Sequence, residues 1–287
     1  MEAINKIELE ELLVIDIETT TLVKQLELNT PLFDAWSYTN KKLNLTDIEL
    51  LDLYHEKGAL YPEFGRIACI SVGTLHNGNF VTMTFNDENE KELIEKFNKT
   101  LRRKHWKVSG HFIKTFDIPY IFKRSIVNGV IPHKLVDVSG KKPWEIIWIV
   151  DTAELWGFTS LVAVTNALGI PSPKDDISGA DVPKMYWDGE IERISRYCEK
   201  DVEAVYNILY RFKNISDVPA PLVEKPLLTA MFEGHFSEAD NEILKTLFND
   251  ATKENAEKMS TILNAIVSTA KGKTTKLTKA HIKQLNS

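Results

Sequence analysis

The stretch LLVIDIETTT (Leu12–Thr21) places two acidic residues in a run that otherwise has the composition of a strand. Residues 12–15 are apolar without alternation, which predicts a buried strand. Asp16 and Glu18 follow two positions apart, and residues two apart point to the same face of a strand. Burying two carboxylates side by side is costly unless positive charge joins them. The stretch therefore predicts a cation-binding site where the first strand ends.

Composition limits the class of protein. The chain has 287 residues, 43% of them hydrophobic, which suffices for one large domain with an appendage or for two domains. Its net charge of −6 argues against a protein that coats nucleic acid, but not against an enzyme that gathers acids in a metal site. Cys69 and Cys198 lie far apart and form no CxxC motif, which excludes a zinc knuckle and argues against a disulfide scaffold.

The sequence shows no signal for a membrane or for secretion. No apolar run approaches the roughly 18 residues needed to span a bilayer. The first residues, MEAINKIELEELL, are acidic and amphipathic and lack the features of a secretory signal. We therefore expect a cytoplasmic protein with no membrane partner.

The order of the predicted elements indicates an α/β fold. Strands are expected at residues 11–17, 66–75, 79–85, 106–112 and 144–150, and helices at 87–104, 116–128, 159–170 and 188–212. The pair Asn77-Gly78 between the second and third strands is typical of a β-hairpin. A hairpin followed by alternating helices and strands predicts a mixed five-stranded sheet flanked by helices.

The chain divides into two predicted domains. Residues 1–215 hold the sheet, with a polar insertion at residues 21–61 in which one helix is expected near 47–56. After a proline-bearing stretch, a capping-box pattern at residues 237–240 opens an apolar periodicity typical of a helix. Residues 216–287 are therefore expected to form a small C-terminal all-helical appendage with a basic tail.

Two further motifs carry acidic residues. Asp117, in FDIPYI, follows the fourth predicted strand and starts a helix, where an Asp is often only an N-cap. Tyr197 and Asp201, in YCEKDV, lie four residues apart and share a face of the last predicted helix. Taken alone, the second motif is better explained by a packed Tyr beside a solvated Asp.

Together and in this order, VIDIETT, FDIPYI and YCEKDV resemble the motifs of the DEDDy 3′–5′ exonucleases, the tyrosine-containing branch of the DnaQ-like superfamily. The nearest resemblance is to stand-alone exonucleases similar to the proofreading domain of family-B DNA polymerases. It covers residues 11–212 and implies a ribonuclease-H-like fold. Each motif is weak alone, but the three in order are specific.

The resemblance also implies a chemistry. It implies two-metal-ion hydrolysis that removes nucleoside 5′-monophosphates from a 3′ end, with two Mg²⁺ or Mn²⁺ ions held by carboxylate oxygens. The implied metal ligands are Asp16, Glu18, Asp117 and Asp201. Tyr197 would orient the attacking water, because a phenol with an ordinary pKa of about 10 favours orientation over full proton abstraction.

One position departs from the family pattern. Relatives carry an Asn several residues before the Asp of the second motif, where this chain has Phe112 after His111. The departure bears on substrate contacts rather than on the metal site. His111 could replace the missing contact, although a lone His near a strand end is more often structural.

Other candidate residues have a structural alternative. Asp151, after the fifth predicted strand, is expected to cap the turn that follows it rather than to join the site. Trp144, Trp148 and Trp156 are expected in the core. The basic run at residues 99–107 is either solvated surface or a phosphate track. Candidate nucleic-acid contacts are Thr19, His111, Phe116, Lys271, Lys273 and Lys276.

The sequence is compatible with three functions. The first is a 3′–5′ exonuclease that acts on single-stranded 3′ ends of DNA in proofreading or repair, in trans to a replicative polymerase, because no polymerase domain fits in this length. The second is an exoribonuclease of the same superfamily, since sugar discrimination depends on few contacts. The third is a non-catalytic nucleic-acid-binding or scaffold protein, against which the complete set of motif residues argues.

Overall fold

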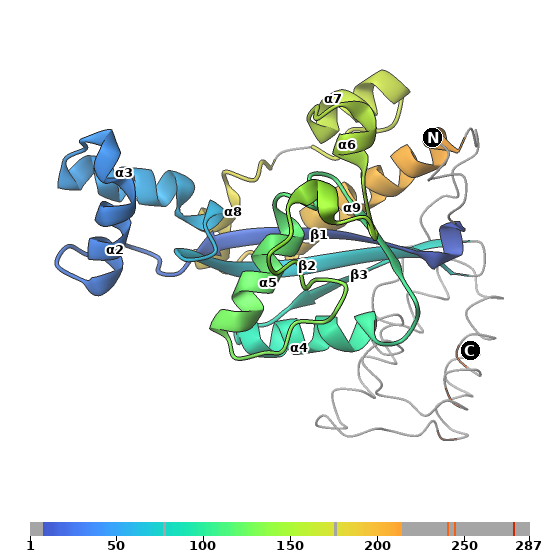
Figure 1. Ribbon diagram of the computed structural model, residues 1–287, viewed down its shortest axis with the longest axis horizontal. Helices are drawn as coiled ribbons and strands as arrows, with labels where there is room; N and C mark the ends of the chain where they lie inside the picture. Colours follow the sequence, from blue (N-terminus) through green and yellow to red (C-terminus); the bar gives the residue numbers. More distant parts are fainter. Residues whose placement is uncertain are drawn as a thin grey trace.

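A five-stranded mixed sheet runs through the computed structural model, which describes residues 8–76, 79–174 and 177–213, and Asp240, Leu244 and Thr278 (Figure 1). The strands are β1 (Leu12–Thr21), β2 (Gly65–His76), β3 (Asn79–Asn86), β4 (Lys107–Gly110) and β5 (Ile149–Asp151). Their order is β3-β2-β1-β4-β5. The pairs β1·β2 and β2·β3 are antiparallel, and β1·β4 and β4·β5 are parallel. The predicted mixed five-stranded sheet of an α/β fold is confirmed.

Helices cover both faces of the sheet. They are α2 (Pro31–Asn40), α3 (Asp47–Lys57), α4 (Glu90–Leu101), α5 (Asp117–Val127), α6 (Thr152–Trp156), α7 (Leu161–Leu168), α8 (Val182–Trp187) and α9 (Ile191–Phe212), with short 3-10 turns η1 (Leu9–Glu11), η2 (Lys41–Leu43), η3 (Gly58–Leu60) and η4 (Pro143–Glu145). Among the described residues, no helix has both the length and the apolar character needed to cross a membrane.

Alternation along β1 decides what each face of the sheet contains. Leu13, Ile15 and Ile17 pack in one buried cluster with apolar residues of α4 and α5. Leu12 and Val14 pack in a second cluster with apolar residues of α9. Because side chains alternate along a strand, the acidic residues at positions 16 and 18 continue the series that faces α9.

The first strand is longer than the sequence predicted. It was expected at residues 11–17, with the acids at its end. Pairing with β2 continues as far as Thr21, opposite Gly65, so both acids lie inside the strand. The register between β1 and β2 shifts between Glu18 and Thr19, and such bulges often redirect side chains next to functional sites.

The fifth strand is much shorter than predicted. Of residues 144–150, only the last two belong to β5, while Pro143–Glu145 forms a 3-10 turn. The physical reason is that the partner strand is short: β4 has four residues, and the last three of them pair with β5. Trp144 is consequently 70% exposed, and its expected place in the core is wrong. Trp156 is 37% exposed and also lies outside the core. Trp148 is partly buried and packs against the core.

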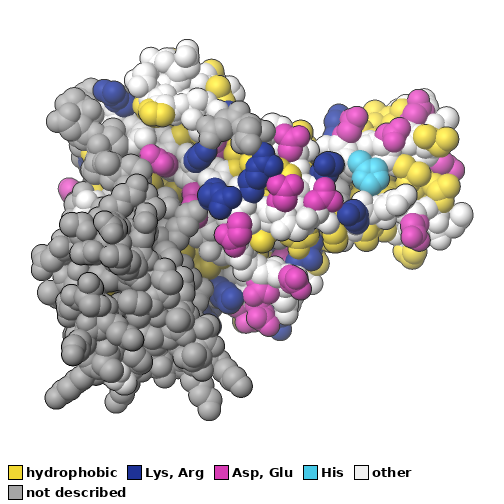
Figure 2. Space-filling model, turned by 180° about the vertical axis from the view of Figure 1, so that it is seen from behind, with side chains coloured by type: hydrophobic (Ala, Val, Ile, Leu, Met, Phe, Trp, Pro, Cys, Tyr) yellow, Lys and Arg dark blue, Asp and Glu magenta, His cyan; other side chains and the backbone are white. Residues whose placement is uncertain are grey.

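The insertion after β1 forms a small helical unit around its own buried cluster, which includes Trp36 and Tyr54. Helix α3 lies where a helix was expected, and Thr46 and Glu49 form a capping box at its start. Helix α2 was not predicted, although Thr30 caps it and Pro31 follows, which is a typical helix start. The unit projects from the end of the sheet where β1 finishes (Figure 1). Figure 2 shows apolar side chains gathered on its surface, among charged ones.

Several sequence predictions fall outside the described residues. These are the Asn77-Gly78 turn, the proline-bearing stretch after α9, the tail lysines and almost all of the expected appendage. The pairing of His76 with Asn79 does confirm the antiparallel hairpin on either side of the turn.

A buried ion pair fixes α5, which carries Asp117, to the rest of the fold. Arg124 Nε donates to the two carboxylate oxygens of Glu90, at 3.0 and 3.2 Å, and both side chains are buried. Glu90 Oε1 also accepts the backbone N–H of Ile67 on β2, at 2.8 Å. Glu90 starts α4, so this pair joins the sheet, α4 and α5.

Replacement of Arg124 should therefore destabilise the whole fold. We expect Arg124→Met to lower the free energy of unfolding by about 3–5 kcal/mol, because the Glu90 charge stays buried without its partner. Lys123→Met is the matched control, since Lys123 pairs with Glu63 at 3.0 Å on the exposed surface and such pairs contribute about 0–1 kcal/mol. Urea unfolding measures both values. Equal losses in the two variants would contradict this account.

Candidate active site

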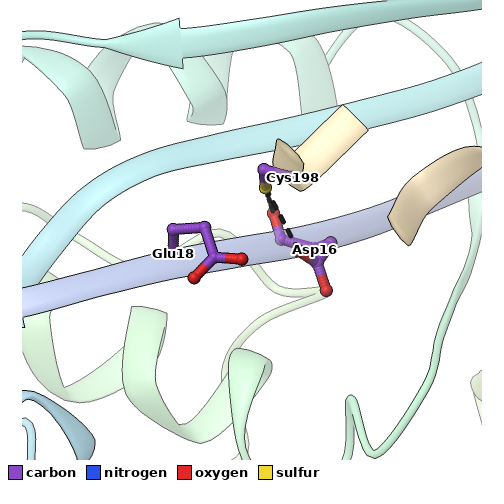
Figure 3. Close-up of side chains that lie close together, drawn as sticks. All are labelled: Asp16, Glu18 and Cys198. Atoms are coloured by element: carbon purple, nitrogen blue, oxygen red, sulfur yellow. Dashed lines mark hydrogen bonds between the residues drawn. The ribbon is translucent and has the colours of Figure 1, made fainter. Parts of the chain in front are cut away.

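Two carboxylates and one thiol lie together on the α9 side of β1. Asp16, Glu18 and Cys198 each have a possible ligand atom within 4.8 Å of those of the other two (Figure 3). The Cys198 thiol donates to Asp16 Oδ2 at 3.1 Å and lies 3.4 Å from the Asp16 carbonyl oxygen. The two acids lie on one face of the strand, as predicted.

Helix α9 contributes Tyr197 and Asp201 to the same region. Both side chains are buried, and the spacing of four residues places them on one face of the helix. The ammonium of Lys174 donates to the Tyr197 hydroxyl and, at 3.2 Å, to Asp201 Oδ2. Asp201 Oδ1 is buried and has no hydrogen-bond partner. The alternative of a solvated Asp beside a packed Tyr is therefore wrong.

Asp117 is the first residue of α5, but it does not act as an N-cap. Its Oδ1 accepts the backbone N–H of Ile17 at 3.0 Å, across 100 residues of chain. Ile17 lies between the two acids of β1, so this bond brings Asp117 up to them. Phe116 occupies the N-cap position, and no side chain caps the helix there. The carboxylate is committed to a tertiary contact rather than to its own helix.

Burial makes ionisation of these carboxylates unfavourable. Burial and the charge of Asp201 together raise the pKa of Glu18 to about 8, although the Lys174 ammonium acts to lower it. Burial likewise raises the pKa of Asp117 to about 7. For Asp16, burial and then the charges of Asp201, Asp117 and Glu18 raise the pKa well above its ordinary value. Burial also raises the pKa of Asp201, against the lowering effect of Lys174.

The donor set fits hard divalent cations. Carboxylate oxygens are the ligands that Mg²⁺ and Mn²⁺ prefer, and four of these groups interact electrostatically here. A buried acceptor without a partner, such as Asp201 Oδ1, is rare in folded proteins unless a donor or an ion satisfies it. Cys198 acts in this arrangement as a hydrogen-bond donor to Asp16.

Sequence reasoning missed Lys174 and Cys198. Cys198 directly follows Tyr197 and precedes Asp201 by three residues, a helical spacing that could have indicated a shared face. Lys174 lies in an irregular segment before α8, and no local pattern indicates where its ammonium reaches.

Other candidates have structural roles in the fold. Asp151 accepts the backbone N–H groups of Phe112, Lys114 and Ala153 at 2.9–3.1 Å, so the expected capping role is confirmed. Both ring nitrogens of His111 are hydrogen-bonded within the protein. Of the other candidate nucleic-acid contacts, Thr19 is buried, and Phe116 is half-buried against the core.

The basic run at residues 99–107 lies near the start of β1. It includes the end of α4 and the start of β4, and Lys107 pairs with Leu12 at the beginning of β1. Its Lys and Arg side chains are exposed. The run therefore meets β1 at its first residue, Leu12, whereas the acids lie further along the strand, at positions 16 and 18.

A comparison with protein families identifies the family of this chain. A family profile described as "Predicted 3'-5' exonuclease related to the exonuclease domain of PolB" matches residues 60–221, more than half of the chain. The match includes Asp117, Tyr197 and Asp201 and begins after Asp16 and Glu18. The family B DNA polymerase from the hyperthermophilic archaeon Pyrobaculum calidifontis is similar in structure, with 18% identity and a TM-score of 0.46. That similarity covers 70% of this chain and 24% of the polymerase, so the chain spans about a quarter of its length. The comparison with curated proteins found no match.

Without divalent cations, the cluster should destabilise the fold as the pH rises. The folded-state pKa of Glu18, about 8, lies above its ordinary value of 4.5. The folded protein thus binds this proton more tightly than the unfolded chain, and stability falls between about pH 4.5 and pH 8. In EDTA, Glu18→Gln should raise the Tm by about 2–4 °C or more at pH 8.5, with little gain at pH 4.5.

Glu56→Gln, at an exposed position of α3, is the matched control and should change the Tm at neither pH. An equal gain from Glu18→Gln at both pH values would contradict the assigned pKa shift.

Proposed function

The chain belongs to the predicted 3′–5′ exonucleases related to the exonuclease domain of PolB, and on that premise we propose that it removes nucleoside 5′-monophosphates from the 3′ end of a DNA strand. We propose a single-stranded 3′ end as its substrate and proofreading or repair, in trans to a replicative polymerase, as its setting. The relation of the family to a polymerase exonuclease domain supports DNA over RNA.

The convergence of four carboxylates from three elements, with three of them buried and Asp16 half-buried, is the observation that carries this proposal. Asp16 and Glu18 come from β1, Asp117 from α5 and Asp201 from α9. The charges of Asp201, Asp117 and Glu18 raise the pKa of Asp16, and Asp201 Oδ1 lacks a partner. Such a concentration of negative charge serves no packing purpose, and it fits a site built to hold cations.

In this proposal, all four carboxylates would hold two Mg²⁺ or Mn²⁺ ions. Asp16 and Glu18 from β1, Asp117 from α5 and Asp201 from α9 would supply the carboxylate oxygens. When bound, the ions would activate the nucleophilic water and stabilise the leaving oxygen of the phosphodiester. The apolar clusters on both sides of β1 hold these ligands in fixed positions.

Tyr197 is the residue proposed to orient the attacking water. Its side chain is buried, and its hydroxyl is held by the Lys174 ammonium, which also contacts Asp201. The hydroxyl therefore has a fixed position beside a carboxylate of the site. Positioning of this kind can contribute a large part of the rate of a reaction between two bound groups.

Asp16→Asn should abolish most of the exonuclease activity. We expect stepwise shortening of a 5′-labelled single-stranded DNA with Mg²⁺ or Mn²⁺, and a loss of at least about 100-fold in kcat in the variant. Mn²⁺ should also raise the Tm of the wild type but not that of the variant. Asp52→Asn, at an exposed position in the middle of α3, is the matched control and should behave as wild type.

An RNA strand of the same sequence forms the second arm of this assay. Faster shortening of RNA than of DNA would favour an exoribonuclease. If neither DNA nor RNA is cleaved with Mg²⁺ or Mn²⁺, the proposed function is wrong.

Tyr197→Phe separates orientation from binding. We expect kcat to fall about 100-fold with little change in KM, because the ring is retained while the hydroxyl that fixes the water is lost. Single-turnover and steady-state rates on the same DNA measure both constants. A rise in KM at constant kcat would instead make Tyr197 a substrate-binding residue.

A further inference from the structure

Two phenylalanines near the site have an unusual backbone conformation. The described residues include four non-glycine positions with positive φ: Asn29, Asn44, Phe112 and Phe158. Asn is enriched in this left-handed region, whereas a bulky side chain there is a genuine outlier. The φ angles of Phe112 and Phe158 are +59° and +61°. Strain of this kind persists only where the surroundings enforce it, and it clusters at functional sites.

The two rings lie next to each other at the surface. Their centroids are 6.4 Å apart, and the ring planes are tilted by 36°. Phe158 is 61% exposed, and Phe112 is half-buried behind it. An aromatic side chain that remains so exposed contributes little to the core, so burial does not compensate for its strained backbone.

Hydrogen bonds brace the two segments that carry these rings. Asp151 accepts the backbone N–H groups of Phe112 and Lys114, at 2.9 and 3.1 Å. His111, next to Phe112, contacts the backbone oxygen of Thr159, next to Phe158, at 2.8 Å. The turn after β4 and the segment after α6 are thus locked together, and the rings have little freedom to separate.

The pair of rings lies one hydrogen-bonded turn from a carboxylate of the site. The carbonyl oxygen of Phe112 accepts the backbone N–H of Phe116 at 3.0 Å, and Phe116 directly precedes Asp117. The second ring follows α6, which begins directly after β5, the strand beside β4 in the sheet.

We propose that Phe158, backed by Phe112, is a stacking platform for one unpaired nucleobase of the substrate strand. This inference rests on the proposed function. A rigid, exposed aromatic face, packed on a residue one turn of chain before Asp117, fits the planar face of a base. Stacking of this kind typically changes affinity by about 5- to 150-fold per base. Neither ring carries a hydrogen-bonding group, so the platform accepts all four bases.

The test measures binding of single-stranded DNA in Ca²⁺. We expect Phe158→Leu, which keeps apolar bulk but loses the aromatic face, to raise the Kd by about 5- to 150-fold. Phe158→Trp should stay within about threefold of wild type. Tyr38→Leu is the matched control and should bind as wild type, because Tyr38 is an exposed aromatic residue on α2.

Abasic substitutions identify the stacked base. One abasic site at a time is placed at each of the last nucleotides before the 3′ end. At one position, the abasic site should weaken binding to the wild type but not to Phe158→Leu, because the same contact is already lost. Equal weakening of both proteins at every position overturns the platform.

A second readout separates a platform from a packing residue. Phe158→Asn should raise the Tm by about 2–4 °C, because Asn tolerates the left-handed conformation, while weakening DNA binding. A lower Tm together with weaker binding would make Phe158 a packing residue and overturn the proposal. If the wild type shortens DNA but Phe158→Leu binds it normally, only the platform is wrong; if the wild type shortens no nucleic acid, the proposed function fails.

Discussion

Like charges buried around the second half of β1 are the constraint on which this structure depends. Side chains alternate between the two faces of β1. The odd-numbered ones pack in the core with α4 and α5, while Asp16 and Glu18 face α9. Burial raises the pKa values of these acids, which means that the folded state is strained by their ionised forms. The apolar packing on the opposite face supplies free energy that offsets this cost.

Three of the four carboxylates are held by donors from different elements. The Ile17 N–H of β1 binds Asp117, the Cys198 thiol of α9 binds Asp16, and Lys174 binds Asp201 from the segment before α8. None of these contacts is local in sequence, so the geometry of the cluster follows from the tertiary fold. The donors orient the carboxylates without supplying as many positive charges as there are acids. This combination of fixed position and uncompensated charge is what a preorganised cation site requires.

Much of the fold was predictable because burial imposes periods on the sequence. Leu93, Ile94, Phe97 and Leu101 are buried on one face of α4, and their helical spacing is what predicts the helix at residues 87–104. The two acids of β1 were predictable for the same reason, since a spacing of two places them on one face. Residues 144–150 were misread because an apolar run does not reveal the length of the partner strand. Lys174 escaped prediction because its contact depends on the course of an irregular segment, which no period encodes.

Phe112 departs from the family pattern in its residue type and also has an unusual backbone conformation. In the family that the motifs resemble, this position carries Asn. In the structure, its backbone is left-handed, a conformation in which Asn is enriched. The backbone therefore has a conformation that a phenylalanine disfavours. Asp151 enforces that conformation from β5, by accepting the Phe112 N–H, and Phe158 repeats the same strain on the facing segment. Two independent outliers that meet at one surface are better explained by a shared contact than by two unrelated packing accidents.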